Sequence, residues 1–373
     1  MNKFLVIFCL FTTKCISQKE NSVLSLNTPY KNNSDYTEVI KCIDSYFNNK
    51  IQNKSWKQNW SSKDTVNNFI DIEIVSLQNS EYYQDYFYYK PTLIFIDEFE
   101  GLTRVKVAFM SIKSEFTGIY NFYLEKDEHS KQFKILSSLR ANTLKWNKKT
   151  IDKIHYISAP NIQVDTLEIL EMRQKIESFN IWFGIQLNNF DYYVCNNFKE
   201  IQEIRGFDYH LTFFDRNEDA SITDVHNKRI FAGNKRFSYP HELIHLYTSQ
   251  KYLKKYHSFW DEGIATFLGG SLGKPLEWHL SNLNAEIKSQ SIDFQNLLDL
   301  QNHTPIKKTT NVDYAIAGLL CKKIYEKHGI LGIDKVLNSG QEDEYIYRII
   351  EKLLLVKKEN MNDYIKKELS FYK

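Results

Sequence analysis

The alternation of apolar and polar residues predicts a small helix-plus-sheet unit in the first part of the chain. Apolar positions with helical spacing follow Ser34 and Asp35, either of which is a suitable helix start: Val39, Ile40, Ile43, Tyr46 and Phe47. Segments rich in β-branched and aromatic residues come next and predict strands at residues 91–97, 104–111, 118–125 and 132–138. We therefore expect one helix packed against an antiparallel sheet.

The later part of the chain has a mixed pattern of helices and strands. Residues 165–187 and 198–206 have helical patterns, and residues 191–195 and 228–232 are short apolar strands. An uncharged helix is then expected from Pro240, with Ser238 as its cap, because proline in the first helical turn loses no hydrogen bond. The overall expectation is an α+β protein.

A further helix is expected after residue 257. Ser258-Phe-Trp-Asp261 has the spacing of a capping box, and Gly269-Gly270 marks the end of the segment. Two roles are possible for Asp261: it is part of that cap, or it is a hydrogen-bond partner of a nearby histidine. His257 and His279 have no metal-ligand spacing, so we expect them at the surface.

The helix expected from Pro240 carries His241-Glu-Leu-Ile-His245. Histidines four residues apart lie on one helical face, so His241 and His245 can bind one metal ion while Glu242 faces the water molecule to be activated. Glu262, in the next expected helix, is the candidate third ligand. Two imidazoles and one carboxylate with an open fourth position favour Zn²⁺, although cobalt or nickel would also fit. The alternative is two core histidines and a surface acid, but the joint pattern favours the metal site.

These segments carry a family resemblance. Tyr239-Pro-His-Glu-Leu-Ile-His-Leu-Tyr247, followed by Trp260-Asp-Glu-Gly-Ile-Ala265, resembles the gluzincin metallopeptidases of the zincin-like superfamily over residues 150–373. The resemblance implies two lobes, an upper one of sheet and helix and a lower helical one, with the motif helix lining the cleft. It also implies that Tyr314, at the start of a later helix, stabilises the oxyanion. An interfacial core position is the alternative for this tyrosine.

The expected function is hydrolysis of peptide bonds in a peptide or protein substrate. One Zn²⁺ per chain, bound by His241, His245 and Glu262, would activate water, with Glu242 as general base and Tyr314 as a second catalytic residue. Two alternatives remain open. One is a zinc hydrolase of non-peptide amides or esters, and the other is a binding protein without activity on the same fold.

The N-terminus predicts export. Met1-Asn-Lys and the apolar run Phe4–Phe11 read as a signal peptide cleaved after Ser17, giving a secreted or periplasmic protein, and a lipoprotein anchored at Cys15 is the less favoured reading. The 48 basic and 46 acidic residues nearly balance, which argues against a nucleic-acid partner, and no later segment is apolar enough to span a membrane. We expect a monomer.

The expected organisation has an accessory unit before the metallopeptidase domain. The accessory unit has the outline of NTF2-like or cystatin-like modules. The predicted segments are a signal peptide at 1–17, a flexible segment at 18–33, the α+β unit at 34–144, a linker at 145–153 and a zincin-like domain at 154–373. After cleavage, Cys42, Cys195 and Cys321 would remain, an odd and widely spaced set that is not a disulfide framework.

Overall fold

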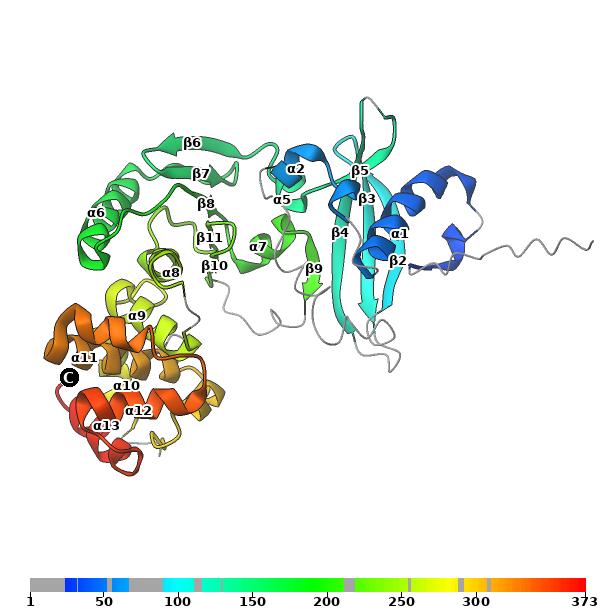
Figure 1. The fold of residues 1–373 in the computed structure, drawn as a ribbon. Coiled ribbons are helices and arrows are strands. Elements are labelled where there is room, and N and C mark those ends of the chain that lie inside the picture. The colour runs from blue at the N-terminus through cyan, green and yellow to red at the C-terminus, as the bar shows by residue number, and fades with distance from the viewer. Residues whose placement is uncertain are drawn as a thin grey trace, which may run out of the picture.

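Two β-sheets and a group of helices follow one another across the molecule (Figure 1). The structure is a computed structural model, and it confirms the α+β expectation. It describes residues 24–31, 33–51, 56–66, 90–110, 116–128, 130–210, 219–253, 256–287, 292–306 and 310–373. The predicted signal peptide lies outside these residues.

The first sheet confirms the strands expected in the first part of the chain. Its strands are β1 (Ser25–Leu26), β2 (Lys90–Phe99), β3 (Leu102–Met110), β4 (Phe116–Lys126) and β5 (Phe133–Leu136), in that order. Helix α1 (Thr37–Ile51) follows a 3-10 turn at Ser34–Tyr36 and packs against the sheet. Ile43, Tyr46 and Phe47 are fully buried in this core, as their helical spacing predicts.

Two segments of the expected organisation contain strands. Within residues 18–33, where we expect a flexible segment, β1 pairs in parallel with β2 and Leu24 is buried; residues 18–23 lie outside the described part. The expected linker, residues 145–153, contains β6 (Asn147–Ile151), which pairs with β7 (Ile154–Ser158). The polar side chains of β6 are mostly exposed, which is why the strand reads as a linker.

A strand from the later part of the chain also belongs to the first sheet. Strand β9 (Phe207–His210) pairs antiparallel with β4. Two short helices, α2 (Ser62–Val66) and α5 (Ser138–Asn142), come from the same part of the chain as the first sheet. At Gly206, with φ of +97°, a Cβ atom would lie 2.6 Å from Oγ of Ser138. The close approach of β9 to α5 therefore requires glycine there.

The second sheet has five strands and confirms the predicted strands near residues 191 and 228. Its order is β10 (Ile222–Asp224), β11 (Arg229–Ala232), β8 (Phe190–Val194), β7 and β6. Strands β7, β8 and β11 are parallel, and antiparallel β10 and β6 form the two edges. The predicted helices are α6 (Thr166–Phe183) and α7 (Phe198–Ile204).

The C-terminal part is helical. It contains α8 (Pro240–Lys251), α9 (Ser258–Gly269), α10 (Leu276–Glu286), α11 (Val312–Val336), α12 (Asp343–Leu354) and α13 (Met361–Leu369). Helix α11 has a kink at Gly329. Further 3-10 turns lie at Thr28–Tyr30, Trp56–Asn59, Leu297–Asn302 and Lys358–Asn360. In the described part of the chain, no helix combines the length and apolar character needed to cross a bilayer.

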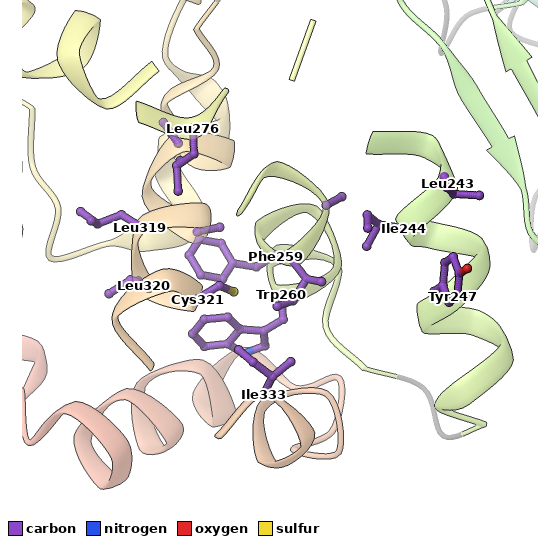
Figure 2. Close-up of a cluster of buried hydrophobic side chains, with 14 of the residues drawn as sticks. Leu243, Ile244, Tyr247, Phe259, Trp260, Leu276, Leu319, Leu320, Cys321 and Ile333 are labelled. Carbon is purple, nitrogen blue, oxygen red and sulfur yellow. The ribbon is translucent and has the colours of Figure 1, made fainter. Parts of the chain in front are cut away.

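The core of this part positions α8 and α9 against α11. Figure 2 shows Trp260 of α9 beside Cys321 and Ile333, which both belong to α11. At Gly263, an added Cβ atom would lie 2.9 Å from the backbone of Ala317. Because α9 and α11 approach this closely, Glu262 on α9 and the N-terminal end of α11 are held in a fixed relationship.

Candidate metal centre

Helix α8 places the His-Glu-Leu-Ile-His sequence on a buried segment. Pro240 occupies the first turn as predicted, but the N-cap is Tyr239, whose side chain makes no capping bond. The prediction that Ser238 caps the helix is therefore wrong. His241 and His245 are 5% and 8% exposed. Burial of two imidazoles on one face requires polar partners, because an unpaired polar group in the interior is costly.

Helix α9 begins differently from the prediction. Its N-cap is His257, whose Nδ1 atom accepts a hydrogen bond from the backbone N–H of Phe259 at 3.0 Å. Ser258 lies inside the helix, so the predicted capping box with Asp261 does not form. The side chain of Asp261 instead bonds to residues of α8. Gly269 ends the helix and Gly270 follows it with φ of +75°, as the glycine pair predicts.

Three potential ligand atoms converge between α8 and α9. Oε2 of Glu262 lies 3.2 Å from Nε2 of His241 and 3.8 Å from Nε2 of His245. The ligand atoms of the three residues all lie within 4.8 Å of one another. Two atoms bound to one tetrahedral Zn²⁺ at about 2.1 Å stand about 3.4 Å apart. The spacing of these residues therefore fits a zinc ion.

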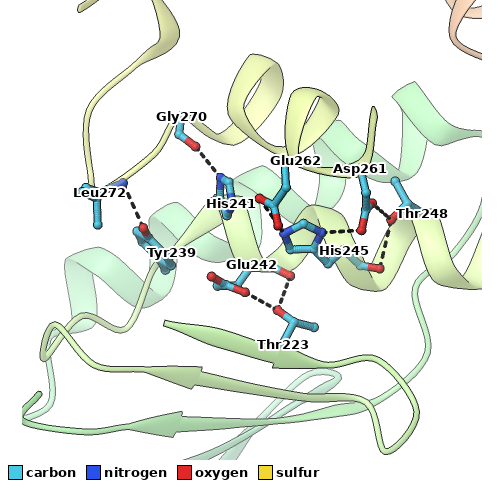
Figure 3. Close-up of polar contacts among 10 residues, drawn as sticks. All are labelled: Thr223, Tyr239, His241, Glu242, His245, Thr248, Asp261, Glu262, Gly270 and Leu272. Carbon is cyan, nitrogen blue, oxygen red and sulfur yellow. Dashed lines mark hydrogen bonds and ion pairs between the residues drawn. The ribbon is translucent and has the colours of Figure 1, made fainter. Parts of the chain in front are cut away.

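The second ring nitrogen of each histidine is held by the protein (Figure 3). Nδ1 of His241 lies 2.7 Å from the carbonyl oxygen of Gly270, and Nδ1 of His245 lies 2.9 Å from Oδ2 of Asp261. Both partners are acceptors, so in the neutral form of each imidazole Nδ1 carries the proton and Nε2 has the lone pair that can bind a metal ion. Oγ1 of Thr248 donates to the other oxygen of Asp261 at 2.7 Å and fixes its orientation.

A close backbone approach makes the Gly270 contact possible. An added Cβ atom at Gly269 would lie 2.6 Å from the backbone nitrogen of His241. A larger residue would push the end of α9 away from the start of α8. The glycine pair that ends α9 thus also brings a carbonyl oxygen to the first histidine of the motif.

The electrostatic balance of the site favours a cation. Burial lowers the pKa of His245, but the carboxylates of Asp261 and Glu262 outweigh burial and raise it to about 10. Burial raises the pKa of Glu262, but His245, His241 and a hydrogen bond from Tyr314 lower it to about 2. Glu242 adds a third carboxylate beside the two imidazoles. Such a buried excess of negative charge is balanced by a metal ion or by protonation.

Glu242 and Tyr314 lie beside the three potential ligands, where the sequence predicts them. Glu242 is 7% exposed and accepts a hydrogen bond from Oγ1 of Thr223. The Tyr314 ring stacks on His241, with centroids 6.0 Å apart and planes 10° from parallel. Tyr314 also lines the cleft at the site. Its side chain also hydrogen-bonds to Glu262, so the hydroxyl faces the three potential ligands.

The site opens into a cleft of about 1060 Å³. Its walls come from β10 and the residues before it, from α8 and α9, from the turn at Ser271 and Leu272, and from the start of α11. Tyr239 holds that turn, because its hydroxyl oxygen accepts from the backbone N–H of Leu272 at 2.9 Å. A cleft of this volume can hold more of a substrate than the reacting group.

His279 does not lie at the surface as expected. It is buried, and its Nε2 atom lies 2.9 Å from the carbonyl oxygen of Ser271, while Nδ1 contacts Oγ1 of Thr310. His279 therefore supports the turn that forms one wall of the cleft. His257 is also largely covered, as the cap of α9.

No known family model matches this chain, and no curated protein is similar to it. The chemical interpretation consequently depends on the geometry of the site itself. Sequence reasoning missed the roles of Thr223 and Tyr239, and it left that of Asp261 undecided. Asp261 had a detectable signal, since it directly precedes Glu262 on a helix. Thr223 had none, because only the folded chain brings β10 beside Glu242.

Proposed function

We propose that this protein is a zinc-dependent metallopeptidase with the ligand set of the gluzincins. One observation carries the proposal. Nε2 of His241, Nε2 of His245 and Oε2 of Glu262 have the mutual spacing of zinc ligands, while both Nδ1 atoms are hydrogen-bonded to protein acceptors. Two histidines with only a structural role in the core would not need Nδ1 atoms bonded to the protein and Nε2 atoms that face a third ligand.

The chemistry follows from the residues around the three ligands. When bound, Zn²⁺ would lower the pKa of a coordinated water toward about 7 and polarise a substrate carbonyl. Glu242 accepts a proton from the attacking water and passes it to the leaving nitrogen. The Tyr314 hydroxyl, beside Glu262, donates a hydrogen bond to the carbonyl oxygen as negative charge develops there.

The cleft favours a peptide over a small ester or amide. Strand β10 is an edge of the second sheet, and residues 219–223 and 225 line the cleft. An edge strand offers free backbone donors and acceptors, with which an extended peptide can pair. A compact ester would use little of this surface. The non-peptide hydrolase therefore remains the second candidate.

The proposal assigns the elements to the lobes of a zincin-like fold. The second sheet with α6 would be the upper lobe, α9 to α13 the lower lobe, and α8 the helix between them (Figure 1). The first sheet and α1 would form an accessory unit, attached through the pairing of β9 with β4. A binding protein without activity is disfavoured, because the proton acceptor Glu242 accompanies the three ligands.

Metal analysis combined with a peptide-library cleavage profile tests the proposal. We expect about one zinc per chain and cleavage that stops when zinc is removed and returns when it is restored. Glu242→Gln should retain zinc and lose hydrolysis, because the amide cannot accept the proton. Glu351→Gln, the same change at an exposed position of α12, serves as the control. A zinc-loaded protein inert toward all peptides but active on esters would instead support the second candidate.

A further inference from the structure

Thr223 of β10 contacts the carboxylate of Glu242. Oγ1 of Thr223 lies 2.6 Å from Oε2 of Glu242 and 2.9 Å from its backbone carbonyl oxygen (Figure 3). Among the residues that the structure describes, Thr223 is the only side chain with a hydrogen bond to this carboxylate. The orientation of Glu242 therefore depends on a residue of the sheet.

The second sheet places Thr223 on the face toward α8. Thr223 is directly opposite Ile230 of β11, so the two side chains share a face. Ile230 is buried in the core that contains Leu243 and Ile244 of α8, whereas Ile222 packs on the other side of the sheet. A slip of one residue in the pairing would turn Thr223 away from Glu242. The contact is thus a consequence of the strand register.

The Thr223 hydroxyl can hydrogen-bond to Glu242 both before and after Glu242 accepts a proton. The threonine hydroxyl has one proton and two acceptors within reach, the carboxylate and the carbonyl of the same residue. It donates to the carboxylate while Glu242 is ionised. When Glu242 holds a proton, the hydroxyl can donate to the carbonyl and accept from the carboxylic acid. Glu242 keeps a partner in both forms.

We propose that Thr223 is a positioning residue that holds Glu242 for proton transfer. This inference rests on the proposed hydrolytic function and adds a residue to it. A carboxylate on a flexible side chain transfers a proton efficiently only when its oxygen is held at hydrogen-bond distance from the reacting water. Loss of the hydroxyl should reduce the rate of the chemical step and leave substrate binding nearly unchanged.

Thr223→Val removes the hydroxyl and keeps the shape, and Thr223→Ser keeps the hydroxyl. For zinc-loaded protein and a peptide selected from the library, we expect Thr223→Val to lower kcat about tenfold with little change in KM. Thr223→Ser should restore most of the rate. Thr150→Val is the matched control, because Thr150 lies on β6, the opposite edge of the same sheet, and its hydroxyl contacts His155.

Crystal structures of the valine and serine variants give a readout independent of activity. We expect the Glu242 carboxylate to move in Thr223→Val and to keep its place in Thr223→Ser. If the wild type cleaves peptides and Thr223→Val is equally fast, or the serine variant is as slow as the valine variant, the positioning role is wrong and the hydrolytic function stands. If the wild type cleaves nothing, the hydrolytic function fails, and an unmoved Glu242 in Thr223→Val would overturn the positioning role as well.

Discussion

Nδ1 of His245 lies 2.9 Å from Oδ2 of Asp261, the residue immediately before Glu262 on α9. Two successive residues of one helix thus contact the same imidazole, Asp261 at Nδ1 and Glu262 near Nε2. Thr248 of α8 donates to the second oxygen of Asp261. The orientation of His245 and the position of the candidate third ligand are consequently coupled through α9.

Replacement of Asp261 by Asn should weaken zinc binding about 10- to 100-fold, because a carboxylate on Nδ1 fixes the tautomer and increases the basicity of Nε2. Zinc affinity measured by competition with a chelator checks this. Asp343→Asn is the matched control, since Asp343 contacts His257, which is not a proposed ligand. Equal zinc affinities for the two variants would contradict the role of Asp261.

Glu262→Gln and Glu262→Ala should lose most of the bound zinc while the fold is retained, because only two strong ligands would remain. Metal content and circular dichroism of the purified variants measure the two effects. Glu277→Gln, which removes a carboxylate paired with Lys322 outside the site, should keep its zinc. Full zinc occupancy in Glu262→Ala would show that Glu262 is not the third ligand.

Tyr314→Phe should lower kcat by about 10²-fold, equivalent to about 2.7 kcal/mol, with little change in KM, because the ring still stacks on His241 but no longer donates to the oxyanion. Steady-state kinetics on a library-derived peptide measure this. Tyr325→Phe on the same helix is the control. A fully active Tyr314→Phe would leave zinc or another donor to stabilise the oxyanion.

Zinc should stabilise the protein more at higher pH. In the protein without zinc, His245 has a pKa of about 10, above the value of about 6.5 expected when unfolded, so its contribution to stability is present below pH 6.5 and lost as pH rises toward 10. Zinc replaces that proton and competes with it less as pH rises. Melting temperatures with zinc and with a chelator should therefore diverge from pH 7 to pH 9. A constant difference would contradict this.

Gly263→Ala should destabilise the protein by about 1–3 kcal/mol, because the new methyl group would meet the backbone of Ala317 at 2.9 Å. In an unhindered helix, the same change is stabilising. Denaturant unfolding measures the free energy, and a zinc titration shows whether the displaced α9 also moves Glu262. A gain in stability without a change in zinc affinity would mean that α9 and α11 can accommodate the added methyl group without displacing Glu262.

Local patterns predicted many of the helices and strands. The alternation in residues 104–111 and the apolar runs near residues 191 and 228 became β3, β8 and β11. The ends of helices were less well predicted. Ser238 and Ser258 have the right chemistry for caps, but the folded chain uses Tyr239 and His257 at these positions. Tertiary contacts outweigh the small free energy of a single cap.

The sequence by itself determined two candidate ligands and the candidate base, because the spacing of His241, Glu242 and His245 along one helix follows from helical geometry alone. The tertiary structure decided how those residues are held. Thr223 reaches Glu242 only through the register of β10, and Asp261 reaches His245 only through the packing of α9 on α8. Neither contact has a fixed spacing in the chain. Each depends on where separate elements pack, and that is a property of the whole fold.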